Sequence, residues 1–192
     1  MVRWRYIMKT FIKVLNDPVN TLKEKHICLS VALLSLTVFI VAILDPILRL
    51  LVNSISIDFI QMVKITLFGY VGYGCYCVGM YLICRLFGSK EKLSCYFTQW
   101  ALSMTPTAIC ALVVTIMENY YYVFWNNSTW GLLLNFVFGG ILIWKTILYI
   151  IFLRNVSNLK SKRLVGAMIL NVIFILALSA VMGYMGLKTP II

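Results

Sequence analysis

Charged residues are scarce in this chain: they make up 12% of its 192 residues, whereas apolar residues make up 62%. A soluble domain carries about a quarter charged residues, so this balance excludes an ordinary globular protein. It predicts an all-α integral membrane protein, with room for about five or six spans of about 20 residues. No length is left for a separate soluble catalytic domain, so any activity must arise in the spans or in their short loops.

Acidic residues and histidine are scarcer still, with six aspartates and glutamates and one histidine in the whole chain. The single imidazole of His26 cannot form a metal site by itself. The sequence also lacks an HExxH motif, a phosphate-binding loop and a Gly-x-Ser-x-Gly elbow. These absences predict a protein that is not an enzyme and that has no catalytic residue, no metal and no cofactor.

Basic residues outnumber acidic ones, which gives a formal net charge of +11. In a soluble protein this excess would suggest a nucleic-acid partner. Here the lysines and arginines gather at the ends of apolar runs, where anionic lipid and the positive-inside rule account for them. We therefore expect the lipid bilayer, and no nucleic acid, as the partner of these charges.

Five apolar runs are long enough to cross a hydrocarbon core of about 30 Å. They cover roughly residues 27–44, 65–87, 96–117, 131–153 and 164–187. We therefore divide the chain into a cytoplasmic amphipathic leader, 1–26, and a five-span transmembrane bundle, 27–192. Pro106 falls inside the third run, where a proline removes a helical hydrogen bond and predicts a kink.

The distribution of lysine and arginine between these runs tests the threading without using hydropathy. From the N-terminus, the segments outside the spans contain six, one, three, none, four and one such residues. The numbers alternate, so thirteen basic residues lie on one side and two on the other. The positive-inside rule then predicts a multi-pass protein of the cell membrane with a cytoplasmic N-terminus and an external C-terminus.

Aromatic and apolar residues mark both membrane interfaces. In the leader, apolar residues three and four positions apart face away from a row of basic ones, which predicts a helix lying in the inner interface. The apolar face of that helix is Trp4, Ile7, Phe11 and Leu15. The outer loop before the fourth span carries an aromatic belt that includes Tyr121, Trp125 and Trp130. The leader helix either anchors the chain or docks a protein partner, and the aromatic loop is either a belt or a ligand cage.

At the end of the leader, the sequence predicts a second, short helix. Asp17 stands where a side chain caps a helix N-terminus, and Pro18 occupies the first helical position, where a missing N–H costs nothing.

Lys145 lies inside the predicted fourth span, where a charge is costly and is by default a candidate polar site. One interpretation gives it a role in transport or substrate binding. The other lets its ammonium reach the inner headgroups or pair with a helix carbonyl. The sequence leaves both interpretations open.

Small residues in two spans predict close helix packing. Gly72 and Gly79 lie on the second span and Gly183 on the fifth, and glycines of this kind let helices approach one another. The contacts lie either within the bundle or at a seam between two copies, so a homo-oligomer is an alternative.

Three segments resemble the Yip family, the Ypt/Rab-interacting membrane proteins, in its compact prokaryotic form. They are the Asn-Asp-Pro leader at residues 16–22, the approach to the third span at 97–106, and the Trp-x-x-x-Leu span with its basic turn at 143–148 and 158–162. The chain departs from the family at Ala101 and Leu102, which replace a Gly-Tyr pair, and it lacks the Asp-Leu-x-Gly-Pro motif of eukaryotic members.

The resemblance implies five spans with a cytoplasmic N-terminus. Eukaryotic members of the family act as trafficking adaptors, and some prokaryotic ones look like accessories of ABC-type export systems. We therefore expect a non-enzymatic membrane adaptor that binds another membrane protein, for which an export system is one candidate. The alternative is a small transporter or an ABC-exporter-associated permease component, which would need a polar cavity near mid-bilayer rather than a packed bundle with an exposed groove.

Overall fold

The structure, a computed structural model, describes residues 17–22, 26–53, 58–120 and 128–184. Every regular element in these residues is helical, and several helices are long and apolar enough to cross a membrane. The prediction of an all-α membrane protein is therefore confirmed. The helices are α2 (Pro18–Thr21), α3 (Ile27–Phe39), η1 (Ile40–Leu44), α4 (Asp45–Asn53), α5 (Phe59–Leu86), α6 (Leu93–Leu102), α7 (Thr105–Asn119), α9 (Ser128–Asn155) and α10 (Ser161–Tyr184).

The first span is longer than predicted. We expected it to end at residue 44, but the helix continues through Asp45 and Pro46 as one apolar run, Ile27–Val52. The π-helical segment η1 ends at Leu44, two residues before the proline. A proline ring clashes with the carbonyl four residues earlier, and a locally widened turn makes room for it without ending the helix.

The second span also begins earlier than predicted, at Phe59 rather than near residue 65. The carboxylate of Asp58 accepts hydrogen bonds from the backbone N–H groups of Ile60, at 2.9 Å, and Gln61, at 3.2 Å. This N-cap satisfies donors that would otherwise have no partner, so the helix starts several residues before the predicted run.

The third predicted span is two helices, α6 and α7, bent by 50°. The break lies at Ser103 and Met104, and Pro106 stands in the first turn of α7 rather than inside a continuous helix. Four runs in the described residues are long enough to span a membrane singly, and the bent pair makes a fifth if its halves cross together.

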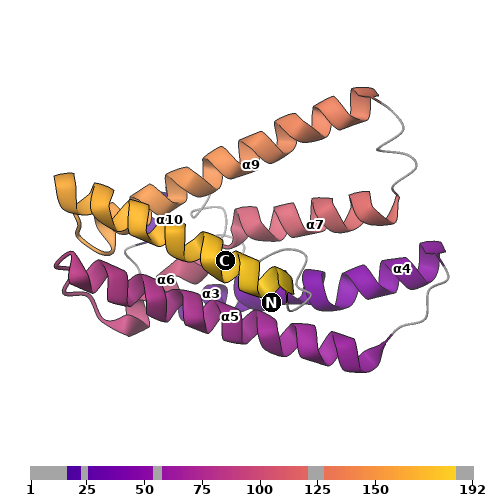
Figure 1. Cartoon of the computed structure of the whole chain (residues 1–192), viewed down its shortest axis with the longest axis horizontal. Helices are drawn as coiled ribbons and strands as arrows, with labels where there is room; N and C mark the ends of the chain where they lie inside the picture. Colours follow the sequence, from indigo (N-terminus) through magenta and orange to yellow (C-terminus); the bar gives the residue numbers. More distant parts are fainter. Residues whose placement is uncertain (1–16, 23–25, 54–57, 121–127, 185–192) are drawn as a thin grey trace, which may run out of the picture.

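The connections between the helices lie at two opposite ends of the bundle. In Figure 1, the α5–α6 and α9–α10 connections lie at one end, and α4, α7 and the start of α9 reach the other.

At the leader, Asn20 donates its backbone N–H to Asp17 Oδ1 at 3.2 Å, which confirms the predicted cap of α2. Leu22, only 1% exposed, fixes the end of the leader in the core.

The short helix α6 occupies the inside of the bundle, against α3 and α5. Side chains of both neighbours donate to its backbone: Ser30 Oγ to the carbonyl of Thr98 at 2.5 Å, and Tyr73 Oη to the carbonyl of Phe97 at 2.6 Å. Trp100 of α6 is 1% exposed and lies at the centre of an aromatic cluster. Its ring centroid is 5.3 Å from that of Tyr76, 5.2 Å from Phe152 and 5.9 Å from Tyr149.

Helices α5 and α10 pack antiparallel along a seam of glycines. At each glycine, a large side chain from the partner helix or its end occupies the space that a Cβ would take. A larger residue therefore fits only if that side chain moves. The pairs are Gly72 with Met182, Gly79 with Phe174, and Gly166 of α10 with Phe87. These contacts lie within one chain.

Gly183, by contrast, is exposed near the end of α10. No described atom lies within 4 Å of the position a Cβ would take there. The expected packing of this glycine is therefore not seen among the described residues.

Candidate functional site

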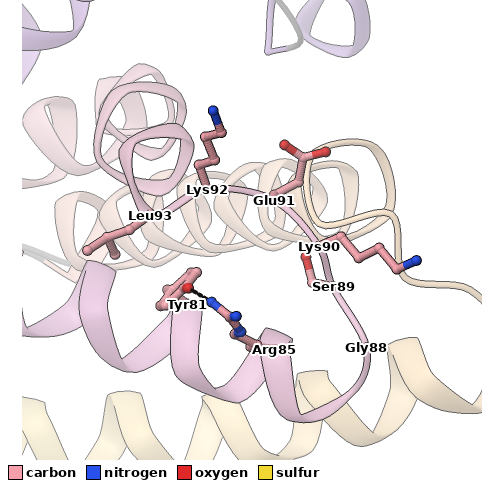
Figure 2. Close-up of a pocket in the computed structure, with 8 residues that line it drawn as sticks. All are labelled: Tyr81, Arg85, Gly88, Ser89, Lys90, Glu91, Lys92 and Leu93. Atoms are coloured by element: carbon pink, nitrogen blue, oxygen red, sulfur yellow. Dashed lines mark hydrogen bonds between the residues drawn. The ribbon is translucent and has the colours of Figure 1, made fainter.

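A pocket of about 550 Å³ opens where the chain passes from α5 to α6 (Figure 2). It lies at the end of the bundle that carries the basic turns, the side assigned to the cytoplasm by the charge distribution. Its lining residues come from the last turns of α5, the loop, and the first residue of α6. They are Tyr81, Arg85, Gly88, Ser89, Lys90, Glu91, Lys92 and Leu93.

The loop is shaped by Gly88, whose φ of +95° suits glycine and few other residues. Its N–H donates to the carbonyl of Arg85 at 3.0 Å, and the N–H of Ser89 donates to that of Cys84 at 3.0 Å. A Cβ at Gly88 would lie 3.2 Å from Nη1 of Arg163, at the start of α10. A second guanidinium therefore lies directly against the loop.

The first guanidinium, that of Arg85, is held on one side of the pocket. It donates a hydrogen bond to Tyr81 Oη, and its Cζ lies 5.6 Å from the centroid of the Tyr81 ring. Figure 2 shows the two side chains together beneath the loop. The pocket lining contains three cationic residues, Arg85, Lys90 and Lys92, and one anionic residue, Glu91, so its net charge is positive.

Beneath the loop, Tyr96 joins the two turns at this end of the bundle. Its buried hydroxyl donates to Ser157 Oγ, in the α9–α10 turn, at 3.0 Å and lies 3.1 Å from Ser89 Oγ. Its ring packs edge-on against those of Tyr81 and Phe152, with centroids 5.6 Å and 5.5 Å away. The pocket therefore rests on a fixed aromatic support.

The α9–α10 turn is equally well defined. Asn158 and Ser161 take positive φ angles of 56° and 51°, and the buried Leu159 donates its N–H to the carbonyl of Leu153 at 3.2 Å. This backbone points the basic side chains outward. Those exposed in and beside the turn are Arg154, Lys160, Lys162 and Arg163.

Lys145 lies elsewhere, in the middle of α9. It is half-buried and lies near Cys110 of the neighbouring helix α7. The structure therefore places this candidate polar site between two helices and apart from the basic pocket.

The predicted interface residues divide between described and undescribed parts of the chain. Trp130 is exposed in the first turn of α9. The others lie outside the described residues: Trp4, Ile7, Phe11, Leu15, Tyr121 and Trp125.

Two features escaped the sequence analysis. One is the contact of Arg163 with the α5–α6 loop, because no local pattern links residues so far apart. The other is a polar stripe on α9: Gly131, Asn135 and Gly139 recur every four residues, Asn135 is exposed, and no described atom lies within 4 Å of a Cβ built at either glycine. This spacing was readable from the sequence.

The described residues contain no group of three or more histidine, cysteine, aspartate or glutamate side chains placed to hold a metal ion. What they do offer is a basic pocket on a rigid base, a lysine between helices and a polar stripe on a membrane helix.

In comparisons with known proteins, a family model described as the Yip1 domain matches residues 19–183, from α2 to the last turn of α10. No curated protein and no solved structure matches the chain.

Proposed function

We propose that this chain, which belongs to the Yip family, works as a non-enzymatic membrane adaptor that binds another membrane protein. The family is not known as an enzyme family, which supports a role in binding. The observation that supports the proposal best is the polar stripe on α9.

Asn135 exposes a carboxamide on a helix long and apolar enough to cross the membrane. Seven residues from Ser128, it lies about 10 Å along the helix, within the apolar run. An amide exposed to lipid lacks hydrogen-bond partners, and membrane helices satisfy such groups by pairing with one another. Gly131 and Gly139, one turn to either side, leave the backbone open to close approach.

Helix α9 is also lightly covered by its own bundle. In its most apolar stretch 22% of the residues are buried, compared with 44% for α5. Its outward surface is therefore available to a partner helix, with Asn135 as the polar contact and the glycines as the contact surface. The proposed partner is a membrane protein that presents a polar or small residue at the same depth, such as a component of an export system.

A photo-cross-linking amino acid at Asn135 tests this proposal in native membranes. We expect it to capture one defined membrane protein, whereas the same group at Leu133, exposed on nearly the opposite side of α9, should capture lipid. Asn135→Leu should lower co-purification of that protein about tenfold, the effect of losing roughly 1.4 kcal/mol of binding free energy. Capture of lipid alone at Asn135 would overturn the proposal, and capture of a second copy alone would replace the adaptor by a homo-oligomer.

A second candidate function, a small transporter or an ABC-exporter-associated permease component, is favoured by Lys145. Its position beside α7 puts a cationic side chain between two membrane helices, where intramembrane charges often serve transport. Substrate flux that depends on Lys145 would favour this function over the adaptor.

A further inference from the structure

We propose that the pocket between α5 and α6 binds the phosphate headgroup of an anionic phospholipid from the cytoplasmic leaflet. This inference is independent of the stripe on α9, because it concerns the other end of the bundle and different residues. It rests on the position of the pocket, on its charge and on its apolar border.

The pocket lies at headgroup depth. Helix α5 has 28 residues and so extends about 42 Å, close to the thickness of a bilayer with its headgroup regions. The pocket begins at the last turns of this helix, which places it at the depth of the phosphate layer.

The charges in the pocket match a phosphate. Arg85 is held by Tyr81, so its planar donors lose little freedom when they bind two oxygens. Arg163 approaches the same loop at Gly88, and Lys90 and Lys92 add two further cations. The carboxylate of Glu91 leaves the net charge positive. Helix α6 begins at Leu93, its N-cap residue Lys92 makes no side-chain cap hydrogen bond, and its first turn contains no acidic residue.

The border of the pocket favours a lipid over a soluble anion. Leu82 and Leu86, on either side of Arg85 along α5, are 54% and 79% exposed, and they continue the lipid-facing surface up to the pocket. Acyl chains would cover these leucines while the headgroup enters. A volume of about 550 Å³ lies within the range of small-molecule sites, about 300–1,000 Å³, and admits a phosphate with its glycerol.

Native mass spectrometry of the purified full-length protein, with phosphatidylglycerol or phosphatidylcholine added in detergent, tests the site. We expect phosphatidylglycerol to bind and to raise the melting temperature more than phosphatidylcholine does. Arg85→Gln should weaken its binding about tenfold, the loss of one charge-assisted contact. Arg154→Gln removes an equal charge from an exposed position outside the pocket lining and should leave binding unchanged.

Three results would overturn the proposal. Equal losses in the two variants would show a diffuse attraction to basic surface rather than a site. Equal stabilisation by inorganic phosphate would assign the pocket to a free anion, and tighter binding of an acidic peptide than of phosphatidylglycerol would assign it to a protein segment. If Arg85→Gln does not fold, Lys92→Gln provides the same comparison, because Lys92 is exposed and its side chain makes no cap contact.

Discussion

Single hydroxyl groups stabilise the end of the bundle that carries the two basic turns. The Tyr96 hydroxyl lies between the Ser89 and Ser157 hydroxyls, and all three residues are buried. Buried polar groups that keep their partners stabilise a fold modestly, but a buried group left without one costs much more. The two turns at this end therefore depend on one side chain of α6.

Tyr96→Phe should lower the free energy of unfolding by about 1–3 kcal/mol, because it leaves two buried serine hydroxyls without their shared partner. Thermal unfolding in detergent measures the loss. Tyr149→Phe is the matched control: the Tyr149 hydroxyl is buried and has no hydrogen-bond partner among the described residues, so its removal should be close to neutral. Similar losses in both variants would contradict this account of Tyr96.

Lys145→Met separates the two candidate functions. If the protein is an adaptor, the neutral and similarly long methionine should keep the α7–α9 contact, the fold and the co-purified partner. If it is a transporter, substrate flux into liposomes should disappear in the variant. A variant that loses its partner while keeping its melting temperature would show that Lys145 belongs to the binding surface.

At the level of elements, the α5–α10 seam fixes how the last span returns against the second. Three glycines receive three large side chains in antiparallel order. The stability of such a seam depends on how closely the two helix surfaces fit, because moving apolar surface from lipid into protein contributes little free energy.

Gly79→Leu should destabilise the bundle by about 1–3 kcal/mol, because the added side chain would collide with the ring of Phe174. Thermal unfolding in detergent measures this cost as well. Gly140→Leu makes the same chemical change on α9, where no described atom lies within 4 Å of the Cβ position, and should cost little. A larger loss at Gly140 than at Gly79 would contradict this account of the seam.

The helices themselves were largely predictable, and their ends were not. Apolar runs locate the spans because lipid selects for them, but the continuation through Pro46 depends on a π-helical turn, and the start of α5 depends on the Asp58 cap. The spacing of Gly72 and Gly79 indicated a packing surface. Its partners Met182 and Phe174 lie more than ninety residues away in sequence, and no local pattern identifies them.

On the scale of the whole molecule, the alternating basic loops predict the threading, and the helix arrangement is compatible with it. The α5–α6 and α9–α10 turns lie at one end in Figure 1, as the charge distribution requires. The basic pocket was less predictable. Its charged loop is visible in the sequence, but Arg163 lies beside that loop only because α10 packs back against α5.

A membrane-impermeant maleimide applied to intact cells tests the orientation. Relative to the unmodified protein, Asn127→Cys should gain labelling because the positive-inside rule places this loop outside. Ser161→Cys, in the basic turn, should gain labelling only after the membrane is permeabilised. The reverse pattern would invert the topology and place the basic pocket on the external face.

The interior position of α6 also bears on how the chain is made. Its neighbours α3 and α5 precede it in the sequence, but Tyr149, Phe152 and Ser157 belong to α9 and the turn that follows it, which are synthesised later. Until that segment leaves the ribosome, the rings and the hydroxyl on one side of α6 lack their partners. We therefore expect α6 to complete its packing only after α9 has been inserted.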